Sequence, residues 1–321
     1  RLECAELRRT LEETAVVMMR AAVFVEPGRI ELQDKPIPEI GPNDALLRIT
    51  TTTICGTDVH ILKGEYPVAP GLTIGHEPVG IIEKLGANVQ GYREGQRVIA
   101  GAICPSFTSY ACQDGLPSQD GGCSCHGYKP MGGWRFGNTI DGTQAEYVLV
   151  PDAQANLAPV PDALTDEQVL MCPDIMSTGF AGAEAANIKI GDIVVIFAQG
   201  PIGLCATAGA RLLGASTIIA IDGNAHRLDI ARGMGADVTL LDTDLDKLRM
   251  SFWRYDNRVH GLASSKLAIE QQVTQADLVI GAVLVPGARA PVLVTNELVS
   301  RMKPGSVLVD VAIDQGGCFE N

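Results

Sequence analysis

The sequence predicts a two-domain protein, in which a β-rich domain is followed by an α/β domain with a doubly wound parallel sheet. The chain has 321 residues, and single hydrophobic cores rarely grow beyond about 250–300 residues. From Arg20 to about Cys172, short β-branched runs are separated by proline and glycine, a pattern typical of strands and turns. After Asp174, short apolar strands alternate with helical segments, which is typical of a parallel sheet. We therefore expect an N-terminal extension at residues 1–18 and domains at residues 19–174 and 175–321.

The expected elements follow this change of pattern. Strands of the first domain are expected at Ala21–Val25, Ala45–Thr53, Val79–Leu85, Arg97–Ala100 and Ala145–Val150. Strands of the second domain are expected at Ile193–Ala198, Thr217–Asp222, Asp237–Leu241, Ala276–Val283 and Ser306–Val311. Helices between them are expected at Ile202–Leu213, Ala225–Met234, Ser265–Thr274 and Val294–Met302. The segment Cys104–Gly137 has no periodicity, so we expect a long loop, and loops of this length are usually functional.

The composition excludes several classes of protein. Hydrophobic residues make up 46% of the chain and charged residues 20%, which excludes disorder and collagen-like repeats. A net charge of −13 argues against a nucleic-acid-binding protein. The apolar runs are far shorter than the roughly 20 residues that a membrane span needs. Nine cysteines without a secretory signal predict reduced thiols and a cytoplasmic protein.

Two motifs in the first domain combine residue types that bind zinc. The segment Cys55–His60 (CGTDVH) is followed about twenty residues later by Gly75–Gly80 (GHEPVG), with further matching positions at Gly86 and Val89. Thiolate, imidazole and carboxylate groups are zinc ligands, and a catalytic zinc keeps one coordination position open. The alternative is a buried histidine and an unreactive cysteine. The spacing Gly-His-Glu-x2-Gly-x5-Gly-x2-Val resembles the zinc signature of the medium-chain alcohol dehydrogenases, and the resemblance covers residues 20–236.

This resemblance implies a GroES-like catalytic domain with one catalytic zinc. Cys55 and His76 would be two of its ligands. The third would come from the segment Met171–Gly179, where Asp174 corresponds to the ligand of the bacterial secondary-alcohol subgroup and Cys172 is the alternative. Zinc in this family acts as a Lewis acid on the alcohol oxygen.

The resemblance also assigns roles to residues around these ligands. Thr57 and His60 would relay the released proton to solvent. Glu77 would be a carboxylate that contacts the ligands without binding the zinc, or an occasional zinc ligand itself. Thr178 would pack against the nicotinamide. Trp134 matches an aromatic residue that walls the substrate pocket of the subgroup, and it fits an ordinary loop anchor equally well.

The cysteine-rich segment departs from the family pattern. Many members bind a second, structural zinc through four cysteines spaced x2, x2 and x7. Here Cys104, Cys112, Cys123 and Cys125 are spaced x7, x10 and x1. We therefore predict one zinc per chain and none in this segment.

A glycine-rich turn follows the first expected strand of the second domain. The segment Ala198–Gly203 has the form G-x-G-x-x-G with alanine in the first place. Gly200 would let the backbone approach a pyrophosphate, and Gly203 would allow the helix to pack closely on the strand. Pro201 and Ile202 open the helix, whose N–H groups would meet negative charge. A plain glycine-rich turn is the alternative to this dinucleotide site.

Two aspartates compete for the adenosine ribose of the cofactor, because each ends a strand. Asp222 lies nineteen residues past Gly203, and Asp242 lies thirty-nine past it. The acid must end the strand that pairs with the one before the turn, so we expect Asp222 to bind the ribose. A carboxylate there repels a 2′-phosphate, which predicts NAD over NADP, although Arg227 nearby could accommodate the phosphate.

From about Gly233 the sequence resembles the NAD domain of alanine dehydrogenase instead. The segments that carry this resemblance are Ala276–Val283, Val285–Ala288, Met302–Gly305 and Ile313–Cys318. The chain is therefore interpreted as a chimera of two nicotinamide enzymes, with residues 258–274 as an extra strand–helix unit. The last strand of the alcohol dehydrogenase sheet is not found before Asn321, which predicts a truncated sheet with an exposed edge and weak domain docking.

Together the resemblances imply an oxidoreductase that transfers hydride between NAD and a small alcohol, a secondary one if the subgroup is followed. One alternative is a catalytically inactive chimera that binds nucleotide and zinc. The other is an alanine dehydrogenase, whose catalytic aspartate Asp314 matches. The expected partners are the alcohol and its aldehyde or ketone, with no nucleic acid and no membrane. The family often forms dimers or tetramers, which allows a homo-oligomer here.

Overall fold

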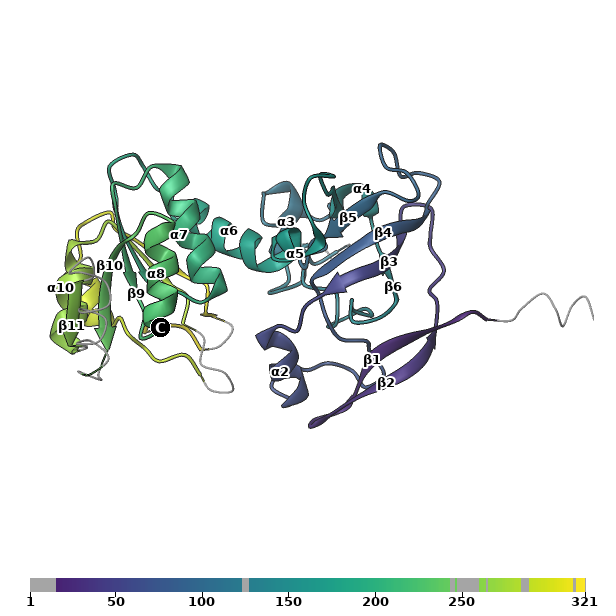
Figure 1. Ribbon diagram of the computed structural model, residues 1–321, viewed down its shortest axis with the longest axis horizontal. Coiled ribbons are helices and arrows are strands. Elements are labelled where there is room, and N and C mark those ends of the chain that lie inside the picture. The colour runs from purple at the N-terminus through teal and green to yellow at the C-terminus, as the bar shows by residue number, and fades with distance from the viewer. Residues whose placement is uncertain are drawn as a thin grey trace, which may run out of the picture. The chain divides into compact units, whose positions relative to one another are not determined.

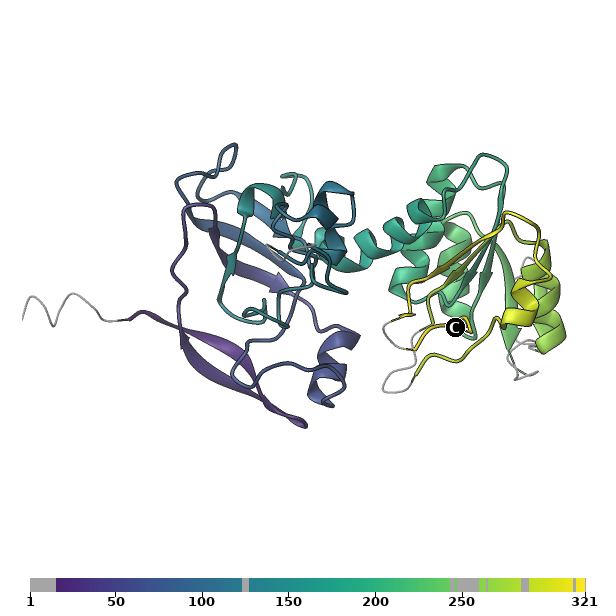
Figure 2. The ribbon, with the colours of Figure 1, turned by 180° about the vertical axis from the view of Figure 1, so that it is seen from behind.

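The computed structural model describes residues 16–122, 127–242, 246, 260–263, 265–283, 289–313 and 316–320. The chain divides into two compact units, residues 1–174 and residues 175–321 (Figure 1; Figure 2). Cys123, Cys125 and Asp314 lie outside the described residues, as does most of the expected N-terminal extension. In the described part of the chain, no helix has the length and apolar character needed to cross a membrane.

An antiparallel sheet of five strands organises the first unit, in the order β6-β3-β4-β5-β7. A separate hairpin consists of β1 (Met18–Glu26) and β2 (Arg29–Pro36). The sheet strands are β3 (Ala45–Thr52), β4 (Pro78–Leu85), β5 (Arg97–Ala100), β6 (Tyr147–Val150) and β7 (Leu157–Pro159). The helical segments are α2 (Gly56–Leu62), α3 (Tyr110–Gln113), η1 (Pro117–Gln119), α4 (Ala153–Asn156), α5 (Asp166–Val169) and the π-helical turn η2 (Cys172–Met176).

The β-rich pattern expected for this unit is confirmed, with one shift at its start. Strand β1 begins at Met18 rather than at Ala21, and the carbonyl of Val17 accepts a hydrogen bond from the N–H of Ile37 at 2.9 Å. Apolar side chains at alternating positions, such as Leu47 on β3 and Ile82 on β4, belong to one buried core. Such alternation is what a strand with one buried face requires.

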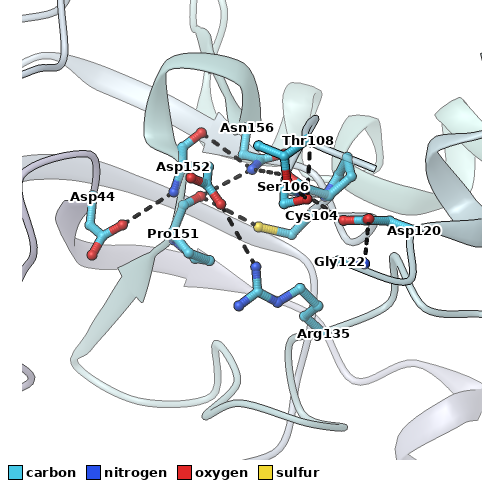
Figure 3. Close-up of polar contacts among 11 residues, drawn as sticks. Asp44, Cys104, Ser106, Thr108, Asp120, Gly122, Arg135, Pro151, Asp152 and Asn156 are labelled. Atoms are coloured by element: carbon cyan, nitrogen blue, oxygen red, sulfur yellow. Dashed lines mark hydrogen bonds and ion pairs between the residues drawn. The ribbon is translucent and has the colours of Figure 1, made fainter. Parts of the chain in front are cut away.

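Polar contacts organise the lobe formed by Cys104–Gly137, and Asp120 is central to them (Figure 3). The Oδ2 atom of Asp120 accepts the N–H of Ser106 at 2.6 Å, and its Oδ1 atom accepts the N–H of Gly122 at 2.8 Å. Burial works to raise the pKa of Asp120, but these N–H groups and the hydroxyls of Ser109 and Ser106 outweigh it and lower the pKa to about 2. A carboxylate that satisfies several backbone donors stabilises this lobe, whose described regular structure is limited to the short helices α3 and η1 and isolated β-bridges.

The start of the lobe is tied to helix α4 by Asn156. Its side-chain amide donates to the carbonyl of Pro105 at 2.9 Å. It also donates to the carbonyl of Pro151 at 3.0 Å (Figure 3). Cys104 lies in the adjacent core, where burial raises the pKa of its thiol to about 12. Cys104 is therefore a packed, protonated thiol at neutral pH.

The second unit is a six-stranded parallel sheet in the order β11-β10-β9-β8-β12-β13. Its strands are β8 (Ile193–Phe197), β9 (Thr217–Ile221), β10 (Asp237–Asp242), β11 (His260–Ala263), β12 (Leu278–Gly281) and β13 (Val307–Asp310). Its helices are α6 (Ser177–Ala185), α7 (Pro201–Leu213), α8 (Ala225–Gly233), α10 (Lys266–Gln275) and α11 (Asn296–Val299).

Strand β8 is buried on both faces, which explains its unbroken apolar sequence. Val194 and Ile196 pack with side chains of α7 and α8, whereas Val195 and Phe197 pack with side chains of α10 and α11. Figure 1 shows α7 and α8 together on one side of this sheet. The doubly wound parallel sheet expected from the sequence is confirmed.

The alanine-dehydrogenase-like part of the sequence supplies four of the six strands. Strand β10 pairs with β9, and β11 with α10 forms the extra strand–helix unit at one edge, as expected. Several expected elements are shorter in the structure. The helix expected from Val294 to Met302 is only α11, the strand expected from Ala276 to Val283 is only β12, and the strand expected from Ser306 to Val311 is only β13. The helix begins late because Val294 forms a β-bridge with Phe319, and the Thr295 side chain caps the helix by accepting the N–H of Leu298.

Substituting Asp120 tests whether its carboxylate stabilises the first unit. Because the pKa of Asp120 is lower in the folded protein than in the unfolded chain, its contribution is full above about pH 4 and is lost as the pH falls toward 2. We expect Asp120→Asn to lower the free energy of unfolding by about 2 kcal/mol at pH 7, and the difference from the wild type to shrink as the pH falls. Urea unfolding of the two proteins across this pH range measures both effects. The control is Asp162→Asn, because Asp162 is exposed. An equal decrease of the free energy of unfolding in both variants would contradict the role of Asp120.

Candidate functional site

The loop before helix α2 holds Cys55 in a fixed position. The Oδ2 atom of Asp58 accepts the N–H of Cys55 at 2.8 Å and the side-chain amide of Gln144 at 3.1 Å. The thiol of Cys55 lies 3.7 Å from the hydroxyl of Thr57. The buried Asp58 carboxylate therefore fixes the backbone from which the thiol projects.

His76 reaches the same place from the segment before strand β4. Gly75 precedes it with a φ of +94°, and a Cβ there would lie 2.5 Å from Cγ of Gln144, so only glycine fits. The side chain of His76 is 4% exposed, and its Nε2 atom lies 3.5 Å from Oδ2 of Asp174. The structure thus brings together residues about one hundred positions apart.

Glu77 adds a second carboxylate, and it is almost completely buried at 1% exposure. Its Oε2 atom accepts a hydrogen bond from the hydroxyl of Thr53. Its Oε1 atom has no hydrogen-bond partner among the described residues. The ligand atoms of Cys55, His76 and Glu77 all lie within 4.8 Å of one another, as in a site that could hold a metal ion.

The electrostatics of this cluster favour a bound cation. Burial works to lower the pKa of His76, but hydrogen bonds to Asp174 and Cys55 and the charges of those groups raise it to about 10. Burial raises the pKa of Glu77 and that of Asp58. Acidic groups crowded in a buried space are costly unless a positive charge compensates them. Zinc fits such a set, because thiolate, imidazole and carboxylate are its usual ligands.

The third expected ligand, Asp174, lies on the π-helical turn η2 together with the alternative, Cys172. Two ligand atoms at about 2.05 Å from a tetrahedral zinc are about 3.3 Å apart, and the 3.5 Å between His76 Nε2 and Asp174 Oδ2 is close to that spacing. Cys172 packs with Val79 and Val169, and burial raises the pKa of its thiol. Asp174 thus contacts His76, whereas the group whose ligand atoms all lie within 4.8 Å of one another has Glu77 as its third member.

Trp134 is a buried anchor that also borders the cluster. Its indole N–H donates to the carbonyl of Phe136 at 3.0 Å, and its ring centroid lies 6.3 Å from that of His76. Tyr66 packs edge-on against both Trp134, at 5.4 Å, and His60, at 5.7 Å. One apolar, aromatic wall therefore lies beside the candidate metal ligands.

Thr178 lies on helix α6 in the second unit, which also contains the glycine-rich turn. Gly203 is required for packing, because a Cβ there would lie 1.8 Å from the carbonyl oxygen of Ala198. At Gly200 a Cβ would meet nothing closer than Nη1 of Arg227, at 3.9 Å, so the space there is open. Ala198 itself has a φ of +64°, the left-handed conformation for which glycine is the usual residue. Helix α7 starts with Pro201 and Ile202 directly after this turn.

Asp222 and Gln199 hold the turn in place. The Oδ2 atom of Asp222 accepts the N–H of Gln199 at 2.6 Å and lies 3.8 Å from Nη1 of Arg227. The buried amide of Gln199 donates to the carbonyl of Ile196 and accepts the hydroxyl of Thr207 at 2.9 Å. Strand β9, which Asp222 follows, pairs with β8, whereas β10, which ends at Asp242, is one strand further away.

Several residues that shape the site lie outside the recognised sequence motifs or at their variable positions. Gln199 occupies a variable position of the glycine-rich motif. Its one sequence signal is that a polar residue stands between a buried strand and a helix, where it needs hydrogen-bond partners. Thr53, Gln144 and Glu65 contact Glu77, Asp58 and His60 respectively. No local pattern marks these three residues, because their contacts depend on the fold.

Part of each unit matches a family model. Residues 41–162 match the model of the alcohol dehydrogenase GroES-like domain, and residues 223–321 match that of the alanine dehydrogenase/PNT C-terminal domain. An alcohol dehydrogenase of Cupriavidus necator is 82% identical over 230 residues, which are 70% of this chain and 63% of that protein. A probable NADP-dependent isopropanol dehydrogenase of Mycoplasma pneumoniae is 36% identical over 219 residues, covering 68% of this chain and 60% of that protein.

A solved structure extends the likeness over most of the chain. The apo form of zinc-dependent alcohol dehydrogenase 2 from Streptococcus pneumoniae superposes with a TM-score of 0.66 at 27% identity, over 91% of this chain and 75% of that one. The chain spans less than two thirds of the length of the curated relatives above. Residues 41–162 are therefore similar to the GroES-like domain of alcohol dehydrogenases, and residues 223–321 are similar to the C-terminal domain of alanine dehydrogenase/PNT.

Proposed function

We propose that the protein is a zinc-dependent oxidoreductase that transfers hydride between a small alcohol and NAD. The observation that carries this proposal is the cluster of Cys55, His76 and Glu77, whose ligand atoms lie within 4.8 Å of one another, with Oδ2 of Asp174 lying 3.5 Å from Nε2 of His76. Its position in a GroES-like domain, in a chain that also contains a dinucleotide turn, supports the same function.

Cys55, His76 and Asp174 would hold the zinc, with Glu77 behind them. When bound, the metal would supply Lewis acidity toward the alcohol oxygen. The chain's own groups orient the site, because Asp58 fixes the Cys55 backbone and Thr53 orients the Glu77 carboxylate. Thr57 and His60 would carry the released proton away.

The aromatic wall supports a small, uncharged substrate. Trp134 and Tyr66 pack edge-on beside His76 and His60 and present apolar surface. The M. pneumoniae relative named above is called an isopropanol dehydrogenase, and we propose a short alcohol, primary or secondary, as the substrate class here.

The arrangement of the second unit supports NAD rather than NADP. Asp222 stands at the end of β9, next to the strand that feeds the glycine-rich turn. A carboxylate has about four acceptor positions. N–H groups of the turn occupy some of them, and the remaining positions can accept hydrogen bonds from the ribose hydroxyls. Thr178 would pack against the nicotinamide, and Arg227 beside Asp222 would neutralise part of its charge without removing its repulsion of a 2′-phosphate.

Removing Asp174 tests the metal site. We expect Asp174→Asn to weaken zinc binding more than about 100-fold, because even residues that only support a ligand change affinity 10–100-fold. The matched Cys172→Ser variant, changed on the same turn, should retain about one zinc per chain. Elemental analysis after dialysis against a chelator gives the stoichiometry of both variants. Loss of zinc from Cys172→Ser with retention in Asp174→Asn would reverse the assignment.

Activity is tested with the zinc-loaded chain, a series of short alcohols and NAD. We expect an alcohol-dependent rise of reduced nicotinamide absorbance, reduced at least about 100-fold in a His76→Ala variant. L-Alanine is supplied with NAD in a separate assay, which tests for alanine dehydrogenase activity. Turnover of alanine alone, or no turnover of any short alcohol, would reject the proposed function.

The cofactor preference is tested at two strand ends. We expect Asp222→Gly to raise the KM for NAD about tenfold or more, because a hydrogen bond to a charged group contributes about 1.5–3 kcal/mol. Asp242→Gly, one strand further from the turn, is the matched control and should leave this KM unchanged. Initial rates with NAD and with NADP measure the preference. The assignment would be overturned if the wild type favoured NADP, or if the KM for NAD rose only in Asp242→Gly.

A further inference from the structure

A glutamate outside the zinc and dinucleotide motifs contacts the buried ring of His60. The Nδ1 atom of His60, in the last turn of α2, is hydrogen-bonded to Oε2 of Glu65. The side chain of His60 is 9% exposed, whereas that of Glu65 is 44% exposed. One carboxylate therefore connects a buried imidazole to solvent.

The backbone builds this pair. Helix α2 ends at Leu62, the N–H of Gly64 donates to the carbonyl of Ile61 at 2.9 Å, and the N–H of Glu65 donates to that of His60 at 3.0 Å. Gly64 has a φ of +75°, and a Cβ on it would lie 2.9 Å from the ring of Pro27, so glycine is required. The turn places Glu65 directly after the helix, close to His60. The backbone, rather than a chance approach of mobile side chains, therefore brings the two groups together.

The contact determines which nitrogen of His60 carries a proton. A neutral imidazole has one N–H donor and one acceptor nitrogen, and a carboxylate at Nδ1 can only accept. Glu65 therefore selects the tautomer with the proton on Nδ1, which leaves the lone pair on Nε2. The edge-on packing of Tyr66 against the ring, at 5.7 Å, restricts rotation of His60.

We propose that Glu65 is a positioning residue that keeps Nε2 of His60 ready to accept a proton and stabilises the imidazolium that results. This inference rests on the proposed function, in which His60 takes up the proton of the alcohol. One proton leaves the alcohol oxygen, Nε2 gains it, and water removes it from the ring, so Glu65 ends unchanged. The same arrangement of carboxylate and imidazole supports general bases elsewhere.

The tautomer is measured without any turnover, by ¹⁵N chemical shifts of the full chain labelled at its five histidines. His60 is assigned with a His60→Asn variant, and spectra are recorded about two pH units above the ordinary histidine pKa of roughly 6.5. The wild type and Glu65→Gln should show the Nδ1–H tautomer, because the glutamine carbonyl still accepts. Glu65→Ala should shift His60 toward the Nε2–H tautomer. An unchanged His60 signal in Glu65→Ala would overturn the inference.

Kinetics tests the negative charge of Glu65, which both variants remove, whereas the ¹⁵N spectra test its hydrogen bond, which Glu65→Gln keeps. We expect Glu65→Ala and Glu65→Gln to lower kcat for alcohol oxidation about tenfold, within the range of general acid–base effects, with KM for the alcohol changed less than about twofold. Glu31→Ala is the control, since Glu31 is also 44% exposed and paired with Arg29. A kcat of Glu65→Ala equal to that of the control would contradict the role. If the wild type oxidises no alcohol, the proposed function fails, while the ¹⁵N spectra still decide whether Glu65 sets the tautomer.

Discussion

The need to compensate buried negative charge around one imidazole shapes the first unit. Asp58, Glu77, Asp174 and the thiol of Cys55 all approach His76 in a space from which water is largely excluded. Ionised carboxylates are not stable in such a place unless they are hydrogen-bonded or meet a cation. Much of the surrounding sequence serves this requirement, because the Thr53 hydroxyl, the Gln144 amide and the N–H of Cys55 each donate to one of these acids.

Close backbone packing around His76 follows from the same requirement. Gly75 takes a left-handed conformation beside Gln144, and a Cβ at Gly142 would lie 2.3 Å from the carbonyl oxygen of Gly75. Thr53 directly follows strand β3 and Glu77 directly precedes strand β4, so the pairing of these two strands brings this donor and acceptor together. The core of the unit and the polar cluster are therefore one cooperative structure, and hydrogen bonds in such surroundings support one another.

Sequence spacing singled out Cys55, His76 and Asp222, because each stands in a motif of fixed length. Their assignments as ligands and ribose acceptor remain predictions. The order of strands in the second unit could also be predicted, since parallel sheets of this kind follow few topologies. Asp120, Gln199 and Glu65 could not, because each acts on a backbone or side-chain group that only the folded loop brings near. The ends of α11 and β12 were missed because an apolar run does not show where its hydrogen bonding changes.

In the described part of the lobe that contains Cys104, a carboxylate and an amide, those of Asp120 and Asn156, fix the backbone by hydrogen bonds. Asp120 and Asn156 have no redox states, and the burial of Cys104 keeps that thiol protonated. Oxidants act on thiolates, and chelators remove metals that thiolates hold. The contacts of Asp120 and Asn156 offer neither agent a target, so the hydrogen bonds that these two side chains make do not depend on the redox state of the neighbouring Cys104.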